Sequence, residues 1–143
     1  KIKALKGPEG WSTRGEEITP LSSQGVKVGV LVCADAYKNE VAAELQRKGA
    51  QLLVSSAAWG PGECAPDGEW ERRSGDTGLP IMVCNRSGYE RPDLDFREAE
   101  SVVAKDGQRL LTGTSDQSVI LTFDWDMESM TLLSDDFQRT YLE

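Results

Sequence analysis

Three short apolar runs, separated by a segment with a helical period, constrain how the middle of this chain can fold. The runs cover Val26–Val32, Gln51–Ser55 and Leu79–Cys84, and each has the length of a buried strand. Between the first two, Asn39–Lys48 places its apolar side chains on one helical face and is followed by a glycine, a frequent helix end. Strands that alternate with helices predict a sheet that is layered with helices.

A short helix is also expected at Glu69–Arg73, and beyond residue 100 the pattern changes from helices to hairpins. Ser101–Ala104 and Arg109–Thr112 flank the sequence KDGQ, whose Asp-Gly pair is a strong signal for a β-hairpin turn. Ser118–Phe123 alternates apolar and polar residues as a further strand. The predicted fold class is therefore α/β with a mixed sheet and a hairpin toward the C-terminus.

The two ends of the chain are less regular. Residues 1–24 are rich in Gly, Pro and Ser without a clean period, which indicates mostly loop. Residues 124–143 are acidic, and one interpretation of them is a C-terminal arm that packs on a neighbouring molecule. No linker or internal repeat interrupts the chain, so residues 1–143 are interpreted as a single domain unit.

Charge and cysteine usage narrow the partners and the compartment. The chain carries 16 basic and 24 acidic residues, a formal net charge of −8, so nucleic acid is not expected as a partner. No apolar run has the length of a membrane span, and residues 1–10 lack the apolar core of a signal peptide. The three cysteines are odd in number and form no CxxC motif, which fits a reducing cytoplasm better than a disulfide framework or a zinc site.

The chain contains no histidine. A Cys-His dyad, a Ser-His-Asp triad and a His-rich metal site are therefore excluded within it. A nucleophilic cysteine here would need a carboxylate or a lysine as its base. Neither a metal nor another cofactor is expected.

Cys33 stands where the first apolar run ends and the chain turns polar. Reactive groups collect at the carboxyl ends of strands in open α/β sheets. At such an end the N–H of Ala34 would stabilise the oxyanion formed when the sulfur attacks a carbonyl, and a following helix would stabilise the thiolate. The competing interpretation is an inert core cysteine, because free cysteine is among the most frequently buried residue types. Pattern alone favours the inert cysteine.

Four segments, taken in order, resemble the nitrilase superfamily of carbon–nitrogen hydrolases, and most closely its amidase-like branch. They are KIKALKGPEGW at 1–11, VKVGVLVCAD at 26–35, GAQLLVSSAAW at 49–59 and GLPIMVCNRSG at 78–88. The resemblance spans nearly the whole chain and ends in the DGQRLL hairpin. It implies the C-terminal half of an α-β-β-α sandwich and a homo-oligomer.

The resemblance also implies residue roles. Family members use a Glu, a Lys and a Cys together, commonly with a second Glu, so Cys33 would be the nucleophile, Lys1 the catalytic lysine and Glu9 the second glutamate. A carboxylate would take the thiol proton and return it to the leaving amine, while Lys1 and the Ala34 N–H hold the oxyanion. By residue type alone, Lys1 and Glu9 would instead be solvated surface groups.

Several other residues carry two interpretations. Trp59, which follows a strand end, is either a core aromatic or a wall of the substrate pocket. Asp35 either contacts substrate or caps the helix after the cysteine. Asn85 and Arg86, at the end of the third run, are interpreted as bonding only to the local backbone. Cys64 and Cys84 are interpreted as non-catalytic.

Two departures from the family pattern affect the expected activity. The family's general-base glutamate lies well before the catalytic lysine, so its counterpart would precede Lys1. The chain is therefore expected to be a partial domain, with the missing N-terminal half as one of its partners. Glu98 and Glu100 place negative charge where family members often have small residues, which would either alter the shape of the loop or disfavour anionic substrates.

The predicted function is hydrolysis of a linear, non-peptide amide-type C–N bond in a small molecule, through a thioester at Cys33. The prediction applies when the N-terminal half is present, and the chain alone is expected to be inactive. Asp35, two residues after the nucleophile, resembles the amide-cleaving branches more than the true nitrilases. Three alternatives stay open: a nitrile-hydrolysing member, a non-catalytic half-fold that acts as a binding or assembly module, and a small unrelated α/β ligand-binding domain.

Overall fold

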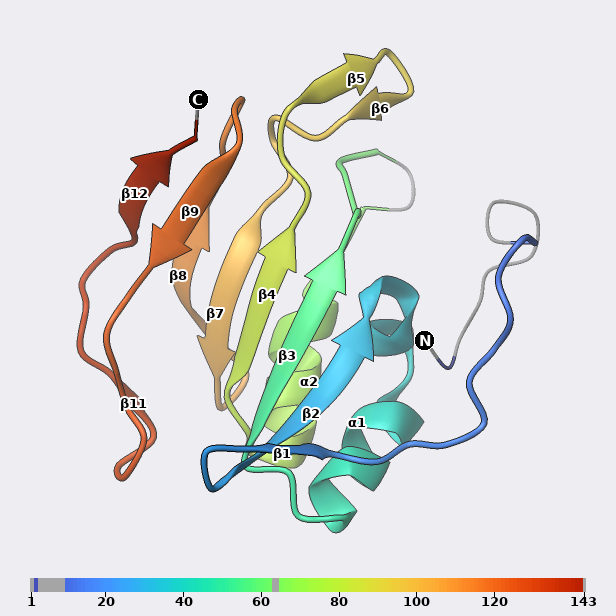
Figure 1. Ribbon diagram of the computed structural model, residues 1–143, viewed down its shortest axis with the longest axis vertical. Coiled ribbons are helices and arrows are strands. Elements are labelled where there is room, and N and C mark those ends of the chain that lie inside the picture. The colour runs from blue at the N-terminus through green and yellow to red at the C-terminus, as the bar shows by residue number, and fades with distance from the viewer. Residues whose placement is uncertain (1, 3–9, 63–64, 143) are drawn as a thin grey trace.

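A six-stranded sheet forms the centre of the computed structural model, which describes residues 2, 10–62 and 65–142 (Figure 1). The strand order is β1-β2-β3-β4-β7-β8. These strands are β1 (Leu21–Ser23), β2 (Val26–Val32), β3 (Leu52–Ala57), β4 (Ile81–Asn85), β7 (Ser101–Lys105) and β8 (Gln108–Gly113). β2, β3 and β4 run parallel, while β1, β7 and β8 join antiparallel. The mixed sheet expected from the sequence is confirmed.

Two helices, α1 (Asn39–Arg47) and α2 (Glu69–Thr77), cover one face of this sheet (Figure 1). α1 approaches β2 closely because Gly29 has no side chain: a Cβ there would lie 2.8 Å from Cδ2 of Leu53 and 3.2 Å from Cβ of Leu45. The buried layer between sheet and helices contains Leu31, Val41, Leu45, Leu53, Trp70, Ile81 and Val102. Neither helix in the described part of the chain has the length and apolar character needed to cross a bilayer.

The elements differ from the sequence expectations mainly at their ends. α2 continues to Thr77, well beyond the expected Glu69–Arg73, and ends at Gly78, which adopts φ +67° as C-terminal glycines commonly do. β4 begins at Ile81, because Pro80 has no N–H for the ladder and sits at the strand entry, where its carbonyl accepts a hydrogen bond from Leu53 N at 2.8 Å. β1 lies within the stretch expected to be loop.

Hairpins form the C-terminal part, as the Asp-Gly pair predicted. Asp106 and Gly107, with φ +52° and +79°, make the turn between β7 and β8. The remaining elements are β5 (Tyr89–Arg91) with β6 (Leu94–Asp95), β9 (Val119–Thr122) with β12 (Gln138–Tyr141), and β10 (Trp125–Asp126) with β11 (Thr131–Leu132). Phe137, in the tail, is buried against Val103 and Leu111. The tail thus packs on its own chain, and packing on a neighbouring molecule stays a prediction.

Over β2, β3 and β4, the sheet face opposite the helices has no covering element in the described part of the chain (Figure 1). Over β7 and β8, Phe137 of the tail packs on this face against Val103 and Leu111. We call the uncovered part the open face and define it by Val30, Val54, Met82 and Cys84, which line a cavity of about 600 Å³ together with residues of β7 and β9. Val30 is 38% exposed and Cys84 is exposed. Parallel strands are normally buried on both faces. The open face therefore lacks the second layer that such strands require.

Candidate active site

The carboxyl ends of β2, β3 and β4 meet at one edge of the sheet (Figure 1). Cys33 follows β2 directly, Trp59 lies two residues beyond β3, and Asn85 ends β4. The strand register pairs Val32 with Ser56 and Ala57 with Asn85, so these ends are level with one another. Residues that are 26 or more positions apart along the chain are thereby gathered around the cysteine.

Cys33 opens a short 3-10 helix, η1 (Cys33–Tyr37), and adopts φ +48°. A left-handed conformation costs a residue with a side chain about 1 kcal/mol or more, and strained backbone of this kind clusters at functional sites. The Cys33 side chain is half-buried and packs against the edge of the main core. Cys33 thus lies at a sharp strand-to-turn junction rather than inside the sheet. The helix that was expected to follow the cysteine and stabilise its thiolate does not begin there: the short η1 comes first, and α1 begins only at Asn39.

Asp35 links the cysteine turn to the first described residue of the chain. Its two carboxylate oxygens accept hydrogen bonds from Ile2 N at 3.0 and 3.2 Å, and one also accepts from Val32 N at 3.1 Å. The residue is 2% exposed. Ile2 packs against the same core as Cys33. The carboxylate therefore bonds to the backbone at the end of β2 and to the distant backbone of Ile2, and the second bond goes beyond the helix cap considered from the sequence.

Three residues singled out in the sequence, Lys1, Glu9 and Cys64, lie outside the described residues. Ile2 directly follows Lys1 along the chain, and its contact with Asp35 places that point of the chain beside the cysteine turn. Ala34 is 1% exposed and belongs to the buried side of the turn. Its role as an oxyanion donor stays a prediction.

Trp59 is 7% exposed and packs between two other aromatic rings. Its ring centroid lies 4.7 Å from that of Tyr37, in η1, and 5.4 Å from that of Trp70, in α2, with edge-on geometry in both pairs. Such pairs stabilise each other beyond their buried area. Trp59 thus connects the cysteine turn to the helix layer, and its packing is that of a core aromatic at the site's edge.

Asn85 holds Trp59 in place, a role that the sequence did not indicate. The Asn85 carboxamide accepts from Trp59 N at 2.9 Å and donates to Trp59 O at 2.9 Å and to Glu100 O at 3.1 Å. Its backbone N–H donates to Ser101 Oγ at 3.0 Å. The carboxamide bonds to backbone groups, as expected, but not only to local ones: Asn85 Oδ1 also accepts from Arg86 N at 3.0 Å, while the Trp59 and Glu100 groups lie 26 and 15 residues away along the chain. The sole sequence signal was a polar amide at the end of an apolar strand.

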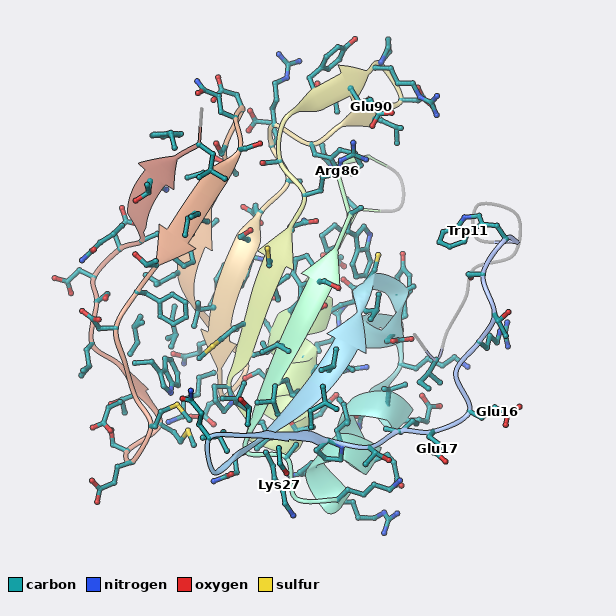
Figure 2. The ribbon with its side chains drawn as sticks, viewed as in Figure 1. Trp11, Glu16, Glu17, Lys27, Arg86 and Glu90 are labelled. Atoms are coloured by element: carbon teal, nitrogen blue, oxygen red, sulfur yellow. The ribbon has the colours of Figure 1, made fainter. Side chains whose placement is uncertain are left out.

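The hairpin of β5 and β6 rises beyond the same edge (Figure 2). Arg86 pairs with Glu90 and places its guanidinium 4.8 Å from the ring centroid of Phe96. Further along, the side-chain hydrogen bond from Arg97 lowers the pKa of Asp95 to about 2. Basic groups near this edge are therefore paired with acidic neighbours.

Glu100, expected to add negative charge near the site, is paired. Arg109, in β8, bonds to Glu100 and also to Glu71 of α2. Burial acts to lower the pKa of Arg109, but its hydrogen bonds to the two glutamates outweigh this and raise the pKa overall. Glu98 is exposed. The negative charge of Glu100 is therefore compensated by Arg109.

No group of three or more metal-ligating side chains occurs among the residues that the structure describes. The site instead consists of a strained cysteine at the end of the parallel strand β2, a buried carboxylate beside it and an aromatic at its edge. These features define a class of α/β structure: a mixed sheet covered by helices on one face, with a cysteine in the turn after a parallel strand. The family profile described as carbon-nitrogen hydrolase matches residues 4–134, so the chain belongs to the carbon-nitrogen hydrolase family.

Solved structures of the same family confirm the fold. A carbon-nitrogen hydrolase from Helicobacter pylori is 25% identical with a TM-score of 0.65, and the match covers 82% of this chain and 48% of that one. An amidase from Nesterenkonia sp. is 28% identical with a TM-score of 0.67, covering 80% and 44%. A cysteine-to-alanine mutant of the Nesterenkonia amidase in complex with butyramide is 26% identical with a TM-score of 0.68, covering 81% and 45%. The chain spans just under half the length of these proteins. A search of curated proteins found no match.

Proposed function

We propose that this chain supplies the nucleophile half of an enzyme that hydrolyses the C–N bond of small linear amides, with Cys33 as the nucleophile. The observation that carries the proposal is the strained, half-buried Cys33 at the carboxyl end of β2. Asp35 supports it, because this carboxylate ties the backbone next to Lys1 to the same turn.

The proposed reaction has two steps. A glutamate from the N-terminal half takes the thiol proton, and the sulfur attacks the amide carbon to form a tetrahedral oxyanion that Lys1 and the Ala34 N–H stabilise. The C–N bond then breaks, and the amine leaves with the proton that the glutamate returns. Water, deprotonated by the same glutamate, attacks the thioester at Cys33; the C–S bond then breaks, the carboxylic acid is released, and the glutamate returns its proton to the sulfur to regenerate the free thiol.

The Nesterenkonia amidase supports a short aliphatic amide as substrate. One of its structures shows the result of Michael addition of acrylamide at the active site cysteine, and another shows covalent addition of the acetamide moiety of fluoroacetamide there. These two structures are 26% and 27% identical to this chain. We carry the substrate class over to this chain as part of the proposal, with Cys33 as the corresponding residue.

The N-terminal half is also the proposed partner of the open face. The chain covers only 44% to 48% of the length of the solved structures in which it finds its fold. Among the described residues, the parallel strands carry an apolar face without a covering layer, and a sheet of this kind requires one. We propose that a second sheet from the N-terminal half packs on Val30, Val54, Met82 and Cys84.

Replacing Val30 by aspartate tests this packing in the full-length protein. Burial of an unpaired carboxylate should lower the free energy of unfolding by about 3 kcal/mol or more. Thr112, an exposed residue of β8, provides the matched control, and Thr112→Asp should change stability by less than about 0.5 kcal/mol. Denaturant titrations of both variants measure the difference. Similar small effects at the two positions would mean that the open face is solvated.

Alkylation of the full-length protein with iodoacetamide tests the nucleophile. We expect Cys33 to react at least about tenfold faster than Cys84 at neutral pH, since an activated thiolate reacts faster than a thiol covered by a second layer. Peptide mass mapping over time gives both rates in one sample. Equal, slow rates at the two cysteines would rule out Cys33 as the nucleophile and leave the binding or assembly module as the better description.

A further inference from the structure

Arg73 of α2 is a buried cation that the proposed reaction does not use. The residue is 8% exposed, although arginine is rarely buried to this extent without full pairing. Its Nη2 forms an ion pair with Asp76 at 2.8 Å, one turn further along the helix. The Asp76 side chain is 39% exposed, so the partner of this buried charge faces solvent.

The second contact of Arg73 leads to the cysteine turn. Nη1 donates to the carbonyl oxygen of Ala36 at 3.4 Å, which joins α2 to η1 across 37 residues of sequence. Ala36 is fully buried and lies three residues after Cys33. The Nε of Arg73 is buried and finds no hydrogen-bond partner among the described residues. Part of the guanidinium's hydrogen-bonding capacity is thus unused, which makes its burial costly.

Trp70 lies three residues before Arg73, and residues at this spacing share one face of a helix. Trp70 is fully buried and packs edge-on against Trp59. One face of α2 therefore supports the site at two points: Trp70 contacts the aromatic at the edge, and Arg73 holds the turn that carries the cysteine. Ala36 offers its carbonyl on the side of the turn that faces the helix.

We propose that Arg73 is a positioning residue for the nucleophile: its bond to the Ala36 carbonyl fixes η1 and keeps Cys33 in its left-handed conformation. The inference rests on the proposed role of Cys33. A strained residue persists only when the surrounding structure holds it, and the Arg73–Ala36 contact is a restraint on this turn that comes from outside it. The Arg73–Asp76 pair alone would merely stabilise α2.

Three variants of the full-length protein separate these roles. Arg73→Met keeps an unbranched side chain and removes both bonds, Arg73→Lys keeps the charge with one donor group, and Asp76→Asn weakens the ion pair while leaving the Ala36 contact. Iodoacetamide rates at Cys33 and Cys84 are measured by mass mapping in each variant, with the thermal midpoint recorded alongside. For variants that turn over an amide, kcat and KM are compared.

We expect Arg73→Met to lower the alkylation rate of Cys33 about tenfold, the effect of losing one hydrogen bond from a charged donor, with the Cys84 rate unchanged. Arg73→Lys should give an intermediate loss of about threefold. Asp76→Asn should leave the Cys33 rate near that of the wild type. Loss of activity should appear in kcat more than in KM, because misplacement of the attacking atom affects the chemical step.

If Cys33 in Arg73→Met is alkylated at the wild-type rate, the inference is overturned. It is also overturned if the alkylation rates of Cys33 and Cys84 rise together, because that result indicates a loosened fold. If Arg73→Met does not fold, Arg73→Lys decides: a slower Cys33 with an unchanged Cys84 supports the role, and unchanged rates at both refute it. Failure of the proposed function is a separate result, since it would appear in the wild type as a Cys33 no faster than Cys84.

Discussion

Replacing Cys33 by alanine in the full-length protein should lower kcat for amide hydrolysis at least about 1,000-fold, because removing a covalent nucleophile leaves only binding and oxyanion stabilisation. The fold should survive the change. Cys33 is half-buried at a strand end, so its replacement leaves little cavity. Ammonia release from acetamide, butyramide and a matching nitrile measures the effect and separates amide from nitrile hydrolysis.

Cys84→Ala provides the matched control. Cys84 lies on the open face, in β4, with β3 between it and the end of β2, and its variant should keep activity within about twofold. A mass increase equal to the acyl group, located at Cys33 in protein quenched during turnover, would show the thioester directly. Equal activity in Cys33→Ala and wild type would remove the mechanism, while absence of activity in all three proteins would favour the assembly module.

The central sheet could be predicted from the sequence because its signals are local. β2 was expected at Val26–Val32 and is found there, since an apolar run bounded by a glycine and a polar turn marks both of its ends. The turn at Asp106 and Gly107 followed from residue types that tolerate positive φ. The end of α2 was missed because its last residues, 74–77, include a glycine and offer no apolar stripe.

The open face and the supports of the site depend on contacts between distant segments, which no local pattern encodes. Asn85 reaches the backbone of Trp59, and Arg73 reaches the carbonyl of Ala36. Both side chains are polar residues in otherwise ordinary elements, and the sequence offers no sign of which backbone groups will face them. Asp35 was recognised as a candidate from its position after Cys33, but its bond to Ile2 requires the chain to return from 33 residues away.

Positive φ at Cys33 is a further feature that sequence alone did not provide. The run of valines predicted where the strand ends, and the position after it predicted exposure of the sulfur. The structure adds the reason why the strand ends so sharply: the left-handed residue redirects the chain into η1, and the Asp35 carboxylate bonds back to Val32 N. Strand end, strained cysteine and buried carboxylate thus form one local unit.

Replacing Asp35 by asparagine in the full-length protein should reduce kcat about 100-fold with a smaller change in KM, because small misplacements of catalytic groups have effects of this size. The carboxylate accepts from Ile2 N with both oxygens and from Val32 N with one. An asparagine retains a single acceptor, and its amide group would face a backbone N–H as a second donor. Stability should fall by about 2 kcal/mol, the cost of leaving a buried donor unpaired.

Asp124→Asn, at an exposed position in the tail, is the matched control and should leave both activity and stability near their wild-type values. Hydrogen exchange adds a readout specific to the role of Asp35, since the amide of Ile2 should lose protection in Asp35→Asn while the amides of β3 keep theirs. If the Ile2 amide stays protected and kcat is unchanged, Asp35 does not hold the Ile2 backbone against the cysteine turn. A fall in kcat together with loss of Ile2 protection would instead tie catalysis to this one carboxylate, because it is the group that joins the backbone beside Lys1 to the turn that presents Cys33.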